Sequence, residues 1–486
     1  MHLIKHFAAL SLLLPSIVAL PSTLHRLQSY NGATTGKYIV ELKPGVSRKD
    51  FLHSLQLSAD GLVEWDVING FAATIDEEAM ALLQSSNDVL SVAEDGHIIN
   101  SQPSPSQRPV IPEEDRRQAQ PVPGNGDDIS AARKIITRTD GSWALGRVAN
   151  GGRCDAYSSI GSSFHWVGVW TRYDNDTAGN GVDIYIVDSG IWENHVRVQN
   201  SSDPERQTHL PRKNDLRGRV RVGVNTYEPG KESSSPILAG THAAVLIPVG
   251  ILNQSSVAAG ARWGFATNAN VISVIVSYND ELDKRHGTVA QLISGLDWIS
   301  KNVKPNRPSV VHISTRNSGY AASVPLDNAV ENLVNAGIHV VVGAGDDGED
   351  VAKSATPSPA RVPSVITVGG TDILETVTLW SNYGAGVDIF APGAGVAGAV
   401  NTIDSTYTTA SSLVTGVVAH LLVKHGALSP AALKTVLVNT AAKNCLSKIR
   451  LLLLHGYTLG GKQESAPDPG KSGTVTTLMT SRHASV

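Results

Sequence analysis

The sequence predicts an α/β protein: a parallel sheet with helices on both faces, preceded by a small α+β domain. From about residue 140 onward, largely apolar, β-branched segments such as VDIYIVDSG and IHVVVGAG alternate with segments of helical pattern. Apolar strands that are separated by helices are typical of a parallel sheet covered on both sides. The smaller domain is predicted from short strand and helix patterns that alternate within residues 36–100.

The segment 36–100 is expected to fold in the order βαββαβ. The strand pattern of GKYIVELKPG ends at a Pro-Gly pair, and Ser47 is the expected N-cap of the helix that follows. Asn69-Gly70 separates two short strands in LVEWDVINGFAATI. DEEAMALLQSS predicts a second helix, because acidic residues favour a helix N-terminus, and DVLSVAED predicts the last strand. This order is that of the ferredoxin-like arrangement.

Other segments flank these two domains. Residues 1–20 have a basic start, an apolar middle and small residues before a proline, the pattern of a secretory signal peptide; a first buried helix is the alternative. Residues 101–135 are rich in proline and predict an extended linker that contains the basic pair Arg116-Arg117. The main domain is expected to span 140–450, and residues 451–486 receive no assignment.

Composition restricts the classes of function. The 486 residues are 41% hydrophobic and 17% charged with a net charge of −4, which allows a large core and gives no sign of a nucleic-acid or membrane partner. The sequons at Asn175, Asn200 and Asn253 agree with secretion. An oxidising compartment permits a bridge between Cys154 and Cys445, but the sequence does not show that they are close. No His/Cys cluster has zinc spacing.

Chemistry is expected at the carboxyl ends of the parallel strands, where ligands and catalytic groups collect in such sheets. In VDIYIVDSGI, residues 182–191, an apolar strand leads directly to Asp188, which Ser-Gly follows. A turn former or a helix cap is the alternative interpretation of this carboxylate.

Four segments resemble the subtilisin-like serine proteases, peptidase family S8, and they follow one another along the chain in the order of that family. VDIYIVDSGI resembles the aspartate motif, and SNYGAGVDIFAPG (381–393) resembles the stretch that precedes the nucleophile. SWALGRV (142–148) resembles the start of the mature domain in secreted fungal, proteinase-K-type members, and 36–100 resembles the inhibitor I9-type propeptide. The resemblance implies a subtilisin-like fold and a triad in the chain order Asp, His, Ser.

The resemblance places Asp188 at the triad acid and Ala239 at the triad base. The family motif His-Gly-Thr-His-Val-Ala-Gly begins with the catalytic histidine, and here LAGTHAAVL supplies Gly-Thr-His after Ala239. A methyl group cannot take the proton that a hydroxyl nucleophile must lose. His242 lies three residues further on, and a packed helix histidine is the favoured interpretation, because a base moved by a helical turn is misplaced by several ångströms.

The nucleophile and oxyanion positions differ as well. STYTTASSLVTG (405–416) puts Thr408 at the serine position and loses the glycine before it, which disfavours the tight turn that presents the hydroxyl. A helix-start residue is the alternative interpretation of Thr408. Asp346 stands at the oxyanion asparagine position, where an ionised carboxylate can only accept hydrogen bonds. Loss of one oxyanion donor costs about 10²–10³ in rate, a value that was measured in this same family.

The family binds its substrate as an added strand beside a Ser-Leu-Gly-Gly segment. The matching residues are Ser314, Thr315, Arg316 and Asn317, after a one-residue insertion, and Arg316 would have to turn away to leave the groove open. Calcium sites are common in the family, but no ligands can be matched here and no other cofactor is indicated. The expected partners are a protein or peptide and the chain's own propeptide domain.

The favoured hypothesis is a secreted, extracellular pseudoprotease of this family. One alternative is an active serine endopeptidase that uses Thr408 and a repositioned base such as His242. Others are a non-enzymatic protein-binding role and a decaying gene copy without function. Because an inactive domain cannot cut its own propeptide, the 36–100 domain is expected to stay attached or to be released by another protease at Arg116-Arg117.

Overall fold

The structure of the chain is a computed structural model. It describes residues 25–57, 59–99, 135–141, 143–150, 168–173, 178–190, 216, 218–230, 257–260, 264–279, 285–313, 316–317, 322–351, 357–372, 375–394, 396, 410–443, 446 and 477–478. Several sequence predictions lie outside these residues: the signal peptide, most of the linker, both cysteines, the three sequons, Arg116-Arg117, Ala239, His242, Ser314, Thr315 and Thr408.

The N-terminal domain, residues 25–99, has the expected βαββαβ order. Its elements are β1 (Thr34–Leu42), α1 (Arg48–Leu55), β2 (Val63–Trp65), β3 (Gly70–Ala73), α2 (Glu77–Ser85) and β4 (Val89–Gly96). The antiparallel sheet has the order β2-β3-β1-β4. Ser47 caps α1 by accepting the N–H of Asp50, and Asp76 caps α2 by accepting the N–H of Ala79.

The main domain contains the parallel sheet that the apolar segments predict. Seven strands are parallel in the spatial order β9 (Val220–Asn225), β10 (Asn270–Ile275), β8 (Asp183–Asp188), β13 (Ser309–Ile313), β15 (His339–Gly343), β16 (Ile366–Thr371) and β17 (Ile389–Pro392). Two short strands, β19 (Thr477–Leu478) and β18 (Ala442–Lys443), continue the sheet beyond β17. All residues of the central strands β8 and β13 are buried.

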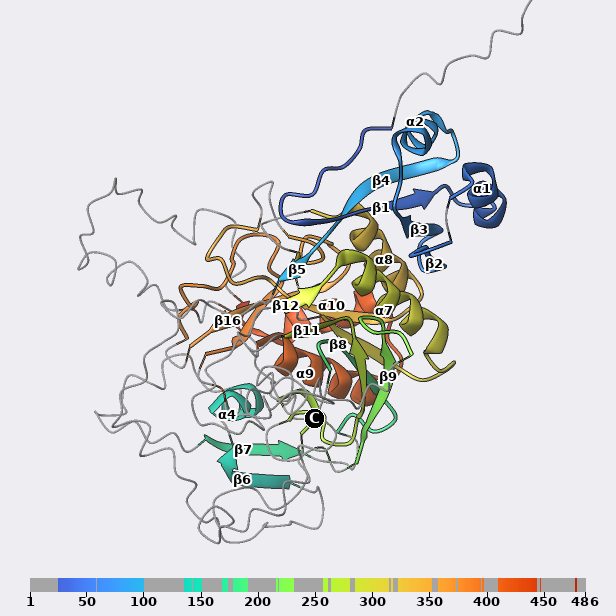
Figure 1. Cartoon of the computed structure of the whole chain (residues 1–486). Coiled ribbons are helices and arrows are strands. Elements are labelled where there is room, and N and C mark those ends of the chain that lie inside the picture. Colours follow the sequence, from blue (N-terminus) through green and yellow to red (C-terminus); the bar gives the residue numbers. More distant parts are fainter. Residues whose placement is uncertain are drawn as a thin grey trace, which may run out of the picture.

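Helices cover both faces of this sheet (Figure 1). On one face lie α7 (Val289–Asn302) and α8 (Val324–Asn335), and on the other α4 (Trp143–Asn150), α9 (Ala410–His425) and α10 (Pro430–Thr440). Side chains of a strand alternate between the faces. In β8, accordingly, Ile184 and Ile186 join the α9 core, whereas Tyr185 and Val187 join the α7/α8 core.

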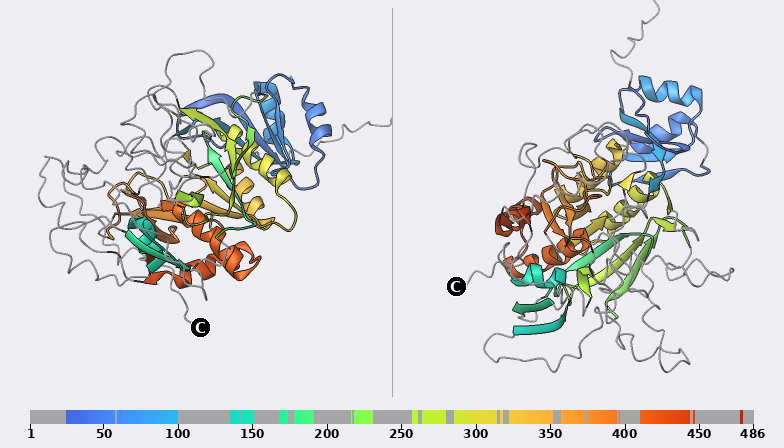
Figure 2. Two further views of the ribbon diagram at one scale, coloured as in Figure 1. Left: turned by 90° about the horizontal axis from the view of Figure 1, so that it is seen from below. Right: turned by 90° about the vertical axis from the view of Figure 1, so that its left-hand side faces the viewer.

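The N-terminal domain packs on the α7/α8 face of the main domain, as Figures 1 and 2 show. The short strands β11 (Ser277–Asn279) and β12 (Arg285–Gly287) pair with each other at this face, and β14 (Arg316–Asn317) pairs with β5 (Ile98–Ile99). A separate antiparallel pair consists of β6 (Ile135–Gly141) and β7 (Gly168–Tyr173).

Within the described part of the chain, no single helix is long and apolar enough to cross a bilayer. Only α9 and α10 taken together pass that test, and they are bent by 107° relative to each other. Eleven of the sixteen residues of α9 are buried inside the protein, which explains its apolar composition by core packing.

Candidate functional site

Asp188 lies where the sequence predicts it, at the carboxyl end of the central strand β8. Its side chain is 1% exposed, and its Oδ1 accepts the backbone N–H of Ser189 at 2.7 Å. The chain then turns at Gly190, whose φ of +104° is favourable only for glycine. The strand end thus holds a carboxylate in the interior while the chain leaves the sheet.

An imidazole lies beside this carboxylate, on the neighbouring strand. His312 of β13 is opposite Ile186 in the parallel register, so it shares the α9 face with Asp188 two residues further along. Its Nε2 lies 3.0 Å from Ser411 Oγ and 3.4 Å from Ser412 Oγ, in the first turn of α9. Among the described residues, its Nδ1 has no hydrogen-bond partner.

The protein interior determines the charge state of this imidazole. His312 is fully buried, and burial lowers its pKa to about 4, although the negative charge of Asp188 acts in the opposite direction. Asp188, His312 and Ser411 are the residue types of a triad, but they are 1%, 0% and 6% exposed. In this packing a peptide cannot reach the Ser411 hydroxyl, so the cluster joins β13 to α9.

Asp346 lies at the end of β15, two strands from β8, and is 7% exposed. Asn382 fixes the loop around it: its Nδ2 donates to Ala344 O, and its Oδ1 accepts the N–H groups of Asp347 and Glu349. Gly345 has φ +108°, and a Cβ there would meet Asn382 Nδ2 at 2.4 Å. The loop therefore holds a carboxyl group at the position for which the resemblance predicts an amide donor.

The predicted substrate strand is already paired with another segment of the chain. Arg316 and Asn317 of β14 pair antiparallel with Ile99 and Ile98 of β5, and His97 forms an antiparallel bridge with Thr288. Ile98 is 1% exposed and belongs to the α7/α8 core. The end of the N-terminal domain thus adds a strand where the family resemblance places a bound peptide.

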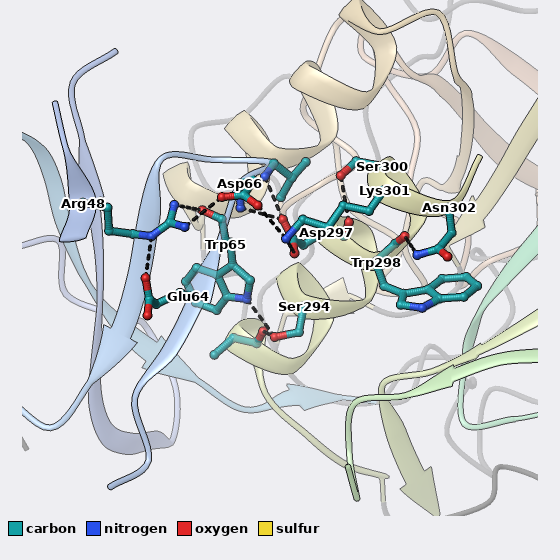
Figure 3. A network of polar contacts seen from close by, with 12 residues as sticks. Arg48, Glu64, Trp65, Asp66, Ser294, Asp297, Trp298, Ser300, Lys301 and Asn302 are labelled. Atoms are coloured by element: carbon teal, nitrogen blue, oxygen red, sulfur yellow. Dashed lines mark hydrogen bonds and ion pairs between the residues drawn. The ribbon is translucent and has the colours of Figure 1, made fainter. Parts of the chain in front are cut away.

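A second attachment joins the β2–β3 turn to the middle of α7 (Figure 3). Asp297 Oδ1 accepts the backbone N–H groups of Asp66 and Val67 at 2.7 and 2.8 Å, and Trp65 Nε1 donates to Ser294 Oγ at 2.8 Å. Lys301 Nζ lies 2.7 Å from Asp66 and 2.8 Å from Asp297. Hydrogen bonds from Lys301 and Arg48 hold the pKa of Asp66 below its usual value.

Apolar contact accompanies these polar contacts. Trp65 and Ile68 are each 1% exposed, and they belong to one hydrophobic core with Val289 and Leu296 of α7. At the start of α7, Asp95 Oδ1 accepts the N–H of Ala290 at 2.9 Å. The two domains therefore share a continuous core that polar contacts border at the start and in the second half of α7.

The structure brings together only some of the predicted site residues. Asp188 and Asp346 lie at the same edge of the sheet, and the backbone of Arg316 and Asn317 forms the paired strand β14. The positions of Ala239, Thr408, Ser314 and Thr315 lie outside the described residues. Sequence reasoning missed His312, although a histidine within the apolar strand SVVHIS was a signal that a polar group is buried there.

The described residues form no metal site of side-chain ligands. No group of three or more His, Cys, Asp and Glu side chains among them is arranged to hold a metal ion. One set of backbone and carboxylate oxygens does converge on a cation, at the end of the sheet opposite to Asp188, and that cation is the ammonium of Lys434.

The fold and this edge define an α/β protein of the subtilisin-like class, with a buried carboxylate at the end of a central parallel strand. The family model of the subtilases, Peptidase_S8, matches residues 179–466. The chain therefore belongs to the subtilase family.

Several relatives are fungal proteases. Subtilisin-like protease 2 of Pseudogymnoascus destructans is 31% identical over 67% of this chain and 70% of its own length. The cuticle-degrading protease of Metarhizium anisopliae is 28% identical over 91% of this chain and 96% of its own length. A solved structure of a cold adapted subtilisin-like serine proteinase is 25% identical, with a TM-score of 0.46, over 64% of this chain and 92% of that chain.

Proposed function

We propose that the chain is a secreted, extracellular member of the subtilase family with little or no peptide hydrolysis, and that its N-terminal domain is a propeptide that covers the peptide groove. The observation that carries the proposal is Ala239 at the position of the triad base. Without a base, a hydroxyl nucleophile near neutral pH remains protonated and attacks an amide poorly.

The changes at the other positions support this proposal. Thr408 adds a methyl group at the nucleophile position, and Asp346 replaces an oxyanion donor with a carboxyl group. In subtilisin, where this cost was measured, removal of the triad serine or histidine costs about 10⁶ in turnover, and the remaining rate depends on the oxyanion hole. Here that hole is altered as well, so a low residual rate is expected.

The imidazole of His312, which lies near Asp188, does not replace the missing base. His312 is enclosed and in contact with two hydroxyls of α9, where a substrate amide has no access. The names of the fungal relatives, which include cuticle-degrading proteases, support secretion and an extracellular setting. The same names favour the second candidate, an active serine endopeptidase.

The test is hydrolysis of casein and of a panel of chromogenic peptides by the purified secreted protein. We expect no turnover above that of a buffer control. Turnover that a serine-directed phosphonate abolishes would contradict the proposal and would favour an active endopeptidase.

A binding role without hydrolysis is supported by a separate observation. The groove strand β14 accepts Ile98 and Ile99 as an added strand, and strand addition requires main-chain hydrogen bonds and side-chain pockets but no catalytic group. Capture of extended peptides after removal of residues 25–99 is the expected activity in that case, and it can be measured by fluorescence anisotropy of labelled peptides.

A further inference from the structure

Lys434 of α10 ends among three oxygen atoms that come from separate parts of the chain. Its Nζ lies 2.7 Å from Pro363 O, 2.7 Å from Val365 O and 2.7 Å from Asp388 Oδ1. The two carbonyls belong to the segment before β16, and Asp388 precedes β17. We call these three oxygens the oxygen cage.

The cage is built independently of the lysine. Asp388 Oδ2 accepts the N–H of Thr367 at 2.8 Å, and the N–H of Asp388 donates to Thr367 O at 3.0 Å. The carboxylate is therefore held against β16 by backbone contacts. Burial raises the pKa of Asp388, and the positive charge of Lys434 opposes that shift.

The three oxygen atoms of the cage are ligands of the kind that a hard cation prefers. Calcium takes carboxylate and backbone carbonyl oxygens, completed by water, whereas a lysine in an ordinary ion pair needs only one carboxylate. Here the three N–H donors of one ammonium meet three converging oxygens. The Lys434 and Asp388 side chains are 20% and 21% exposed, so water could complete the coordination of an ion.

We propose that this oxygen cage is a calcium-type site in which Lys434 permanently supplies the cation. A divalent ion and an ammonium cannot share three oxygens, because like charges at this distance repel each other strongly. The resemblance to the family leaves calcium open, and at this point of the fold the chain does not fit a bound ion. Truncation of Lys434 is expected to turn the cage into a calcium site.

The experiment measures the thermal unfolding midpoint of the full chain in EDTA and in 10 mM CaCl₂. The variant Lys434→Ala opens the cage, Lys434→Met fills the space without charge, and Lys434→Ala with Asp388→Asn removes the carboxylate. Lys424→Ala, at an exposed lysine of α9, is the control for loss of a lysine. Terbium luminescence reports ion binding directly.

We expect Lys434→Ala to have a lower unfolding midpoint than the wild type in EDTA. Calcium should raise the midpoint of this variant by more than it raises that of the wild type. For an affinity in the range of extracellular calcium modules, 10 mM calcium shifts the folding equilibrium by about 10- to 100-fold. The wild type, Lys424→Ala, Lys434→Met and the double variant should lack this increment.

Two results would overturn the proposal: a folded Lys434→Ala without the calcium increment, or an increment that persists in the double variant. If Lys434→Ala does not fold in EDTA, its refolding yield in calcium relative to EDTA gives the same comparison. A yield that calcium does not raise then counts against the proposal. None of these readouts depends on peptide hydrolysis.

Discussion

The side chain of His312 has to stay neutral to keep its contacts between β13 and α9. Protonation would add a charge to a fully buried site and make both ring nitrogens N–H donors, although Nδ1 has no acceptor among the described residues. The groups that face the ring are Asp188 from β8 and the hydroxyls of Ser411 and Ser412 from α9.

Replacement of His312 by Asn should remove part of the acid sensitivity of the fold. The folded-state pKa is about 4 and the ordinary value is 6.5, so the unfolded chain takes up the proton first as the pH falls. Stability is therefore complete above pH 6.5 and decreases until about pH 4. The wild type should lose about 3 kcal/mol more than His312→Asn between pH 7 and pH 4.

Urea unfolding at a series of pH values measures this difference. The exposed His53 provides a matched control, because His53→Gln should leave the pH profile of the wild type unchanged. Parallel stability curves for the wild type and His312→Asn would show that the protonation of His312 does not limit acid stability.

At the site, the sequence predicted the features that follow from which residue stands at the end of a strand. Asp188 and Asp346 stand at the ends of apolar segments, and parallel strands bring such ends to one edge. His312 was missed because a histidine within an apolar strand does not reveal its partners. The oxygen cage of Lys434 was missed because two of its ligands are backbone carbonyls, which any residue can supply.

Among the elements, α7 forms hydrogen bonds with the N-terminal domain in both of its halves. Asp95 accepts a hydrogen bond from its first turn, and Asp297 accepts two from the β2–β3 turn in its second half. The N-terminal domain is therefore attached to both halves of α7, to α8 through Asn328 and Asn332, and to β14 through β5.

Removal of the Asp297 carboxylate should weaken this attachment. Asp297→Ala leaves the N–H groups of Asp66 and Val67 without their acceptor and separates Lys301 from one of its two partners. Hydrogen bonds to a charged group contribute about 1.5–3 kcal/mol each. We expect the attachment to weaken by about 3 kcal/mol, on the order of 100-fold.

The measurement uses the full chain with a specific protease site inserted between residues 101 and 134. After the cut, size-exclusion chromatography at falling concentration gives the dissociation of the N-terminal domain. Asn302→Ala is the control, because the Asn302 side chain donates a hydrogen bond to Trp298 O within α7 itself, as Figure 3 shows. If the N-terminal domain dissociates equally from Asp297→Ala and from the wild type, the contacts of the Asp297 carboxylate with the β2–β3 turn contribute nothing to the attachment.

The elements themselves were largely predictable, whereas their long-range pairing was not. The helices α7, α8 and α9 follow from their apolar patterns, and Thr288 and Gln291 form a capping box at the start of α7. The pairing of β5 with β14 joins residues more than 200 positions apart, and no local pattern specifies it. The same is true of Trp65 and Ser294.

In the molecule as a whole, two domains pack together around α7 and α8. The shared core contains Trp65, Ile68 and Ile98 of the N-terminal domain, all at most 1% exposed. Separation of the domains would expose these side chains to water, at a cost of roughly 1.5–3 kcal/mol for each large apolar side chain.

Maturation should therefore differ from that of an active relative. We expect that the secreted protein either begins upstream of residue 36 or is cut near Arg116-Arg117 by another protease. N-terminal sequencing of the secreted protein decides between these outcomes, and Thr408→Ala should give the same N-terminus. A cut at another position that is lost in Thr408→Ala would indicate self-processing.

We propose that this member of the subtilase family has no working nucleophile and no working base at its triad positions. Its most direct test compares peptide hydrolysis by the wild type and by Thr408→Ala at equal protein concentration. We expect the same rate for both, at the level of the buffer control. A rate of the wild type that exceeds the buffer and disappears in Thr408→Ala would contradict it.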